Sequence, residues 1–263
     1  MPFPPSARVL YDKNPLTEVI CQLRFPPVLQ IVADAPARFQ NAVRGRGYPL
    51  YEVDDQSLQL PREFSAALAQ LGGSLTIGPE HTAHKFLSEE SDRFISLSRE
   101  FLALTDSSYT RWERFIEHVE LAQAALQEVY APAFYTRVGL RYRDVIDRVK
   151  FELQDTPWQE LINPALLGAL GDAAIRDDVQ EIQGSALIAL PEPIGSLARL
   201  RHGLIRQPDS PQNYVVDVDF YLEGRSEPAD VRGILDQFNR EAGHLFRWAI
   251  SPRLHGALGP TTI

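Results

Sequence analysis

The stretch Phe134-Tyr-Thr-Arg-Val-Gly-Leu-Arg-Tyr-Arg-Asp-Val-Ile146 is typical of a long β-strand, in which we expect a bulge at Gly139. Its triplet Leu140-Arg141-Tyr142 is similar to Leu23-Arg24-Phe25, which begins 117 residues earlier in another strand-like run, residues 17–25. Two strand-like segments that carry matching triplets indicate an internal repeat.

Two further elements recur at the same offset. The strand-like stretch 94–104 corresponds to 211–221, and the helix-like stretch 109–130 corresponds to 226–247. Three elements at one offset predict a tandem duplication, although few side chains are identical. Because the two modules of such a repeat meet at a seam, we expect ligands or partners to bind there.

Turn residues and apolar periodicity predict the elements of each repeat. In the first repeat, we expect strands over 17–25, 48–53, 57–60, 81–88 and 93–105, a helix from Asp34, a short helix over 63–71 and the long helix over 109–130. In the second repeat, we expect strands over 134–146, 180–190, 196–205 and 214–222, a helix over 156–170 and a last helix from Ser226.

The long helices decide the predicted architecture. Each carries a single apolar stripe, which it can bury only against the face of a sheet. We therefore predict an α+β fold of two tandem β-α-(β)-β-β-α modules, residues 1–131 and 132–263. An antiparallel sheet with the long helices packed on one face would join the two modules tightly.

Charge and composition exclude several classes of protein. The chain of 263 residues has a net charge of −9, and acidic residues outnumber basic ones in both halves. Nucleic-acid binding is therefore unlikely, because it depends on neutralising phosphates with basic side chains. RNA binding by a duplicated ferredoxin-like unit is disfavoured for the same reason.

Cysteine usage and hydropathy indicate a cytoplasmic protein. Cys21 is the only cysteine, so a disulfide within the chain and a cysteine-based zinc site are excluded. The beginning of the chain lacks the charged and apolar regions of a signal peptide, and no window resembles a membrane span. We therefore expect Cys21 to be a buried core thiol and the protein to have no contact with a membrane.

Four arginines define the candidate ligand site. Arg137, Arg141 and Arg143 are two to six residues apart in one predicted strand, so they project from the same sheet face. Guanidinium groups bind carboxylates or phosphates through paired hydrogen bonds, which predicts an anion clamp. Arg24 would add a fourth guanidinium, with Tyr142 as a packing support. The alternative is that these arginines pair with acidic neighbours inside the chain.

Two other sets of residues are candidate metal sites. Asp217 and Asp219 share the polar face of a predicted strand, where paired carboxylates can hold Mg²⁺ or divide acid and base roles. They fit equally a solvated face or salt bridges to the arginine strand. His81 and His84 are three apart in a strand and face opposite sides, which disfavours a zinc site. The preferred interpretation has no metal and no cofactor.

Three blocks of sequence carry a family resemblance. They are Asn14-Pro-Leu-Thr-Glu-Val-Ile20, then Leu97-Ser-Arg-Glu-Phe-Leu-Ala-Leu104 with Tyr109-Thr-Arg-Trp-Glu-Arg-Phe115, and Arg137-Val-Gly-Leu-Arg-Tyr-Arg-Asp-Val-Ile146. Their order resembles a sporadically distributed prokaryotic protein family of unknown function. The resemblance implies an accessory protein of mobile or defence-type loci, and it supplies no catalytic residue. That family tends to have Asn where this chain has Asp144.

The absence of a phosphate-binding loop and of a nucleophile elbow favours a non-enzymatic protein. We expect it to bind a partner protein or a small anionic ligand, with Arg24, Arg137, Arg141, Tyr142 and Arg143 as the site. The alternative is a metal-dependent phosphoester hydrolase or nuclease-like enzyme that uses the two aspartates. Whether the protein forms a homodimer is left open.

Overall fold

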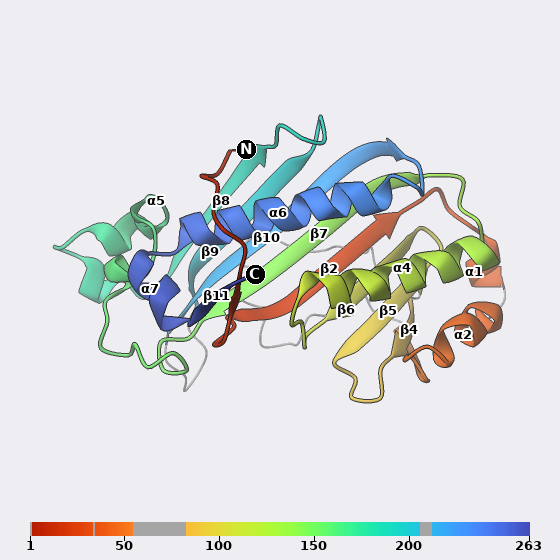
Figure 1. The fold of residues 1–263 in the computed structure, drawn as a ribbon, viewed down its shortest axis with the longest axis horizontal. Helices are drawn as coiled ribbons and strands as arrows, with labels where there is room; N and C mark the ends of the chain where they lie inside the picture. The colour runs from red at the N-terminus through yellow and green to blue at the C-terminus, as the bar shows by residue number, and fades with distance from the viewer. Residues whose placement is uncertain (1, 34, 55–82, 206–211) are drawn as a thin grey trace.

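The protein combines a large antiparallel β-sheet with helices (Figure 1), as predicted for an α+β fold. The computed structural model describes residues 2–33, 35–54, 83–205 and 212–263. The sheet consists of β2 (Leu16–Arg24), β3 (Leu50–Asp54), β4 (Ala83–Leu87), β5 (Arg93–Ser98), β6 (Phe101–Asp106), β7 (Tyr135–Ile146), β8 (Ile182–Ala189), β9 (Leu197–Ile205) and β10 (Asn213–Ser226). Within the described residues, these nine strands follow the order β3-β4-β5-β6-β2-β7-β10-β9-β8, and each neighbouring pair is antiparallel.

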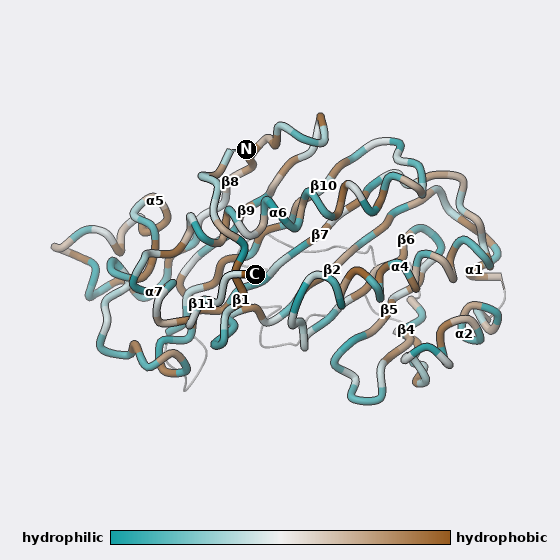
Figure 2. The backbone as a smooth tube through the Cα atoms, in the orientation of Figure 1, coloured by the Kyte–Doolittle hydropathy of each residue, from teal (hydrophilic) through white to brown (hydrophobic). Residues whose placement is uncertain are grey.

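Two helices, α4 (Trp112–Val129) and α6 (Val231–Ala249), cover the same face of the sheet (Figure 1). Hydrophobic residues recur along both (Figure 2), and each helix buries one stripe of them. α4 packs against β6, whereas α6 packs against β7 and β10. The two stripes and the facing side chains of the sheet form one hydrophobic core.

The remaining elements are short. They are β1 (Val9–Tyr11), α1 (Gln30–Ala33), α2 (Ala37–Arg44), α5 (Pro164–Leu167), α7 (Pro252–Ala257), β11 (Pro260–Thr262) and 3₁₀ turns at Trp158–Glu160, Gly168–Gly171 and Arg176–Asp178. β1 pairs with β11, which holds the N-terminal segment across the helix side of the molecule, in front of α6 in Figure 1.

The strands with the matching triplets, β2 and β7, are neighbours at the centre of the sheet. Their register is regular at Gly139, which lies opposite Gln22 of β2 and Tyr221 of β10, so the bulge expected there is wrong. A Cβ atom at Gly139 would lie 2.2 Å from Nη1 of Arg137. A side chain at this position would therefore displace the guanidinium of Arg137, which is the end of a flexible side chain.

The single strand expected over 93–105 is wrong, because the chain reverses in its middle. β5 and β6 form a hairpin that turns at Arg99-Glu100 and pairs Ser98 with Phe101. A turn made of two charged residues lacks the glycine, proline or asparagine that marks most turns in a sequence. By contrast, the hairpin predicted to turn at residues 89–92 is present as β4 and β5.

The helix expected over 156–170 is also wrong. Two 3₁₀ turns flank α5, which starts at Pro164 and is capped by the Asn163 side chain accepting a hydrogen bond from the Ala165 backbone at 2.9 Å. Proline has no N–H to donate, so a continuous helix cannot run through this position. The expectations for Asp34, residues 57–60, residues 63–71 and His81 lie outside the described residues.

The two halves of the chain present their strands in the same relative order, β2-β6-β5-β4 and β7-β10-β9-β8. The offset between them varies, however. Leu102 lies opposite Leu23, and Phe220 lies opposite Leu140, so β6 and β10 correspond at 118 residues rather than 117. Six buried positions of α4 match buried positions of α6 at an offset of 119 residues. The single offset of 117 thus describes only the central strands.

We predict that Leu126→Ala lowers the free energy of unfolding by about 2–5 kcal/mol, because Leu126 is fully buried between α4 and the sheet. Glu128→Ala, at an exposed position of the same helix, should change it by less than about 0.5 kcal/mol. Urea denaturation measures both. Equal effects would contradict the orientation of α4.

Candidate functional site

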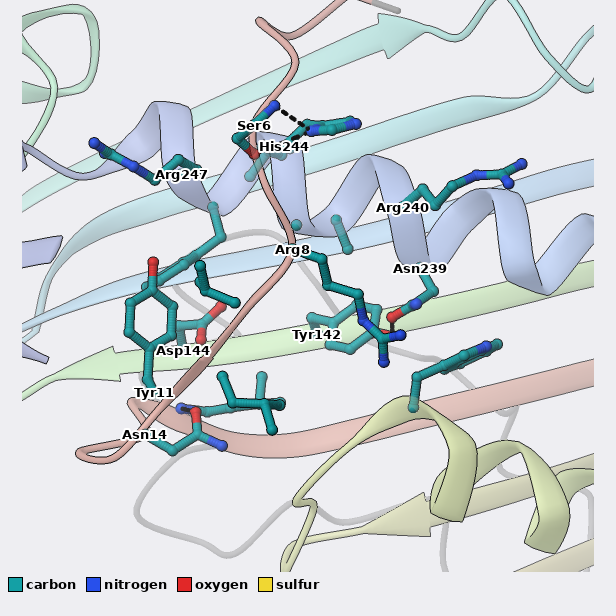
Figure 3. Close-up of a pocket in the computed structure, with 18 of the residues that line it drawn as sticks. Ser6, Arg8, Tyr11, Asn14, Tyr142, Asp144, Asn239, Arg240, His244 and Arg247 are labelled. Carbon is teal, nitrogen blue, oxygen red and sulfur yellow. Dashed lines mark hydrogen bonds between the residues drawn. The ribbon is translucent and has the colours of Figure 1, made fainter. Parts of the chain in front are cut away.

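A pocket of about 350 Å³ lies on the helix side of the sheet (Figure 3). Its walls come from α6, from the residues that lead into α4, and from the N-terminal segment. These three parts are far apart in the sequence and meet over the central strands. The pocket therefore lies where the two halves of the chain join.

The floor of the pocket is formed by β7 and β10 through Tyr142, Asp144 and Val218. Residues two apart in a strand share a face, so Tyr142 and Asp144 project toward the helices, while Arg141 and Arg143 project from the opposite face. Figure 3 shows Tyr142 and Asp144 beneath the N-terminal segment. Of the predicted site residues, only Tyr142 lines this pocket.

Asp144 is the unusual group of the floor. Its side chain is largely buried, with 6% of the residue exposed, and it lines the pocket. Burial, reinforced by the negative charge of Asp217 on the other face, raises the pKa of Asp144 to about 8. At neutral pH this carboxyl is therefore mostly protonated, and it can donate one hydrogen bond and accept others.

The other polar groups around the floor already have partners inside the protein. The hydroxyl of Tyr142 donates to Oδ1 of Asn239 at 2.8 Å, and the indole N–H of Trp112 donates to Oδ1 of Asp236 at 2.6 Å. The ring of Tyr109 meets that of Tyr142 edge-on, with 6.1 Å between the centroids. The aromatic wall is thus held in place, which leaves Asp144 as a group that a ligand can satisfy.

The N-terminal segment forms the roof of the pocket and is tied down by side chains. The backbone N–H of Ser6 donates to Nδ1 of His244 at 3.0 Å, as drawn in Figure 3. The hydroxyl of Tyr11 lies 2.8 Å from Nδ1 of His255, and Arg8 forms an exposed ion pair with Glu113 at 2.8 Å. Burial raises the pKa of Tyr11 to about 12, so its hydroxyl stays protonated.

Three arginines contribute to the lining, Arg8, Arg240 and Arg247, whereas Asp144 is its one acidic residue among those described. Arg240 contacts the side chain of Gln237, and Arg247 donates to the carbonyl of Ile250 at 3.4 Å. Figure 3 shows the side chains of Arg240 and Arg247 pointing away from Asp144 and from each other, so the three arginines do not form a cluster.

The predicted arginine site lies on the face opposite the helices, and its arginines pair with the two predicted aspartates. Arg141 donates from Nε and Nη2 to the two oxygens of Asp217 at 2.7 and 2.5 Å. Arg137 donates from Nη2 to both oxygens of Asp219 at 3.0 and 2.8 Å. Arg141 and Arg137 thus form internal salt bridges with the two aspartates. This is the alternative interpretation that the sequence offered for both the arginines and the aspartates.

These ion pairs are shielded from water. Asp217 is fully buried and Arg141 is nearly so. Burial alone would lower the pKa of Arg141, but the adjacent Asp217 carboxylate outweighs it and raises the pKa above its ordinary value. Burial raises the pKa of Asp219 despite the nearby guanidinium of Arg137. The pairing thus keeps charges in an interior that would otherwise disfavour them.

The same face carries the other predicted arginines and two more that sequence reasoning did not identify. Arg24 lies directly opposite Arg137 across β2 and β7, and burial lowers the pKa of Arg143. From β9, Arg199 and Arg201 lie opposite Asp219 and Asp217. The face is therefore rich in positive charge, but binding of an external anion by these arginines stays a prediction.

The described residues hold no group of three histidine, cysteine or acidic side chains that could bind a metal ion. His84 contacts the hydroxyl of Tyr51 through Nδ1 at 2.9 Å. Burial raises the pKa of Cys21 to about 12, so this thiol stays protonated in the core. Among the described residues, Asp217 and Asp219 form salt bridges with Arg141 and Arg137 and do not converge with a third carboxylate on a metal site.

Sequence reasoning missed the pocket and its floor carboxyl. One signal was present, because Tyr142, Asp144 and Ile146 share the core-facing side of their strand, and an acid at such a position is unusual. The N-terminal and α6 contributions carried no comparable signal, because they depend on how distant segments pack.

No protein-family model matches this chain, and no curated protein sequence matches it. The resemblance to a prokaryotic family therefore stays a prediction. Among the described residues, none of the helices has the length and hydrophobicity needed to cross a membrane.

We predict that Asp217→Ala lowers the free energy of unfolding by about 3–5 kcal/mol, because Arg141 would remain buried without its counter-ion. The double variant Arg141→Met with Asp217→Leu should lose less free energy of unfolding than the sum of the losses of its two single variants. Urea denaturation of the complete double-mutant cycle measures the coupling. Additive losses would show that the pair contributes nothing beyond its separate side chains.

We also predict that stability falls as pH rises because of Asp144. Its pKa is about 8 in the folded protein and near 4 in an unfolded chain, so between these values the folded state binds the extra proton. Relative to Asp144→Asn, the wild type should lose up to about 1.4 kcal/mol per pH unit from pH 5 to pH 8. Urea denaturation at several pH values tests this, and a constant difference would contradict it.

Proposed function

We propose that this protein is a non-enzymatic binding protein that holds a small ligand in the helix-side pocket. The observation that carries the proposal is the pocket itself, with Asp144 as a largely buried carboxyl on its floor. A carboxyl at this position can exchange hydrogen bonds with a ligand that enters the pocket.

The size and composition of the pocket support a small molecule. A volume of about 350 Å³ is at the lower end of ordinary ligand sites, and such sites combine apolar walls with a few oriented polar groups. The walls here include Leu16, Leu245 and Phe246, and the polar groups include Asn14 and Asp144. The lining contains three arginines and one acidic residue, and this excess of basic residues favours a ligand with negative charge, in line with the small anionic ligand expected from the sequence.

The chemistry of the lining favours binding over catalysis. Oγ of Ser6 lies 3.1 Å from Nδ1 of His244, the separation of a nucleophile and its base. However, the backbone N–H of Ser6 already donates to Nδ1 of His244, so the lone pair of this nitrogen is engaged and is not available to act as a base. The alternative phosphoester hydrolase would need Asp217 and Asp219 to leave their arginines, which makes it the weaker candidate.

We further propose that the two halves are related by tandem duplication, with modules 1–131 and 132–263. The equal strand order and the matched stripes of α4 and α6 support this relation, while the drift of the offset from 117 to 119 fits small insertions in the second half. A defence-type or mobile locus, implied by the family resemblance, is proposed as the setting in which the ligand is recognised.

Small molecules that copurify with the protein test the proposed function. The wild-type protein, isolated from its own host without denaturation, should show a stoichiometric extra mass in native mass spectrometry. Ala242→Phe, which fills the pocket from α6, should abolish that mass. Ala124→Phe, the same change at an exposed position of α4 outside the pocket lining, should retain it. An adduct that survives Ala242→Phe would place the ligand elsewhere and overturn the proposal.

A further inference from the structure

We propose that the edge strand β8 is a docking surface for a second copy of this chain. The two copies would pair their β8 strands antiparallel about a two-fold axis at Ser185 and so join their sheets. No residue of β8 is among the residues that line the helix-side pocket. The inference therefore goes beyond the proposed function and does not depend on it.

The backbone of β8 has an unpaired edge. β8 ends the nine-stranded sheet (Figure 1), and among the described residues it pairs with β9 alone. No backbone hydrogen bond from another described segment reaches it. In an antiparallel ladder, every second residue directs its N–H and C=O away from the neighbouring strand. β8 therefore presents a row of donors and acceptors with which another strand can pair.

The side chains of β8 present no obstacle to pairing. Edge strands are usually protected by charged residues, proline, a bulge or a covering segment. The sequence Ile-Gln-Gly-Ser-Ala-Leu-Ile-Ala contains no charged residue and no proline, and its register with β9 is regular throughout. Leu187 within it is 51% exposed. By contrast, β3 at the other end of the sheet carries Glu52 and Asp54. An uncharged, regular and partly apolar edge favours coverage by another strand.

The order of residues in β8 favours a second copy as that strand. Residues directly opposite each other in a ladder lie on the same face. Ile182 and Ile188 are equally far from Ser185 in opposite directions, so pairing centred on Ser185 places each isoleucine opposite the other one of the second copy. The two-fold axis makes this contact twice. Because both isoleucines already pack against the hydrophobic core, the contacts would continue the core across the interface.

The residues at the two ends of β8 agree with this arrangement. Ile194, in the turn after β8, is 91% exposed, and Ile175, in the segment before β8, is 49% exposed. Antiparallel pairing brings the end of one β8 beside the beginning of the other, so Ile194 of each copy lies toward Ile175 of the second copy. Glu181, next to the strand, falls opposite Ala189 of the second copy, so no like charges meet there.

The symmetry of the pairing limits the assembly to two copies. A two-fold axis that relates antiparallel strands of one sheet runs perpendicular to that sheet, so α4 and α6 of both copies cover the same face of one continuous sheet. Each β8 edge is occupied by the other, and none is left open for a third chain. The proposed assembly is therefore a closed dimer.

Sedimentation velocity of the wild-type chain from about 1 to about 200 µM measures the association. We expect a reversible monomer–dimer equilibrium, because an interface made by one pair of strands is small. Ser185→Lys and Ser185→Glu each place like charges opposite each other at the axis, so each should raise the dissociation constant about fivefold or more. An equimolar mixture of the two variants should recover the dimer, because opposite charges then meet at the axis.

Two controls separate the interface from general effects of charge and folding. Ala124→Lys adds the same charge as Ser185→Lys at an exposed position of α4, and it should leave the dissociation constant unchanged. Circular dichroism shows whether the Ser185 variants fold, and the Glu variant lies opposite Arg201 of β9, where a negative charge suits the fold. In the wild type, hydrogen exchange of the β8 amides should slow as the protein concentration rises, which tests the interface without any substitution.

Several outcomes contradict the inference. A wild-type chain that stays monomeric up to about 200 µM overturns it, as does a dimer whose β8 amides exchange as fast as those of the monomer. If both Ser185 variants dimerise as strongly as the wild type, the interface lies elsewhere. If their mixture stays monomeric, the two-fold axis at Ser185 is wrong. The copurified mass that tests the pocket is measured separately, so the two proposals can fail independently.

Discussion

The central strand β7 is largely buried on both faces, and each ionisable side chain buried there must therefore be paired with an opposite charge or kept neutral. Strands in this situation are ordinarily almost wholly apolar. β7 instead contains Arg137, Arg141, Arg143 and Asp144, which burial would destabilise in their charged forms. The rest of the structure depends on how these charges are satisfied, because β7 joins the two halves of the sheet.

The buried charges on the two faces of β7 are stabilised in different ways. On the face away from the helices, β10 supplies Asp217 and Asp219, and each carboxylate makes two hydrogen bonds to an arginine of β7. Breaking such a buried pair is costly even where its net contribution to stability is small, so the pairs disfavour other registers between the two strands. On the helix side, Asp144 has no comparable partner, and burial keeps its carboxyl protonated instead.

Much of the architecture could be predicted, because it depends on local periodicity. Alternation in β7 places its arginines on one face, and the stripes of α4 and α6 identify the sides that they bury. The turn at Arg99-Glu100 has no turn residue, and Pro164 breaks an otherwise helical pattern, so both escaped prediction. The pocket escaped because its walls come from segments far apart in sequence, whose packing leaves no local pattern.

The difference between the two faces also explains why the sequence pattern indicates the arginines and not the pocket. Clustered charges are conspicuous in a sequence, yet charges that are close in space are as easily paired with each other as with a ligand. A single acid among apolar residues is less conspicuous, but it is harder to satisfy internally. In β7 the charges with partners maintain the sheet, whereas Asp144 lines the pocket beneath the N-terminal segment. The clustered charges of this strand therefore indicate internal pairing, and the proposed ligand site lies on the other face of the sheet.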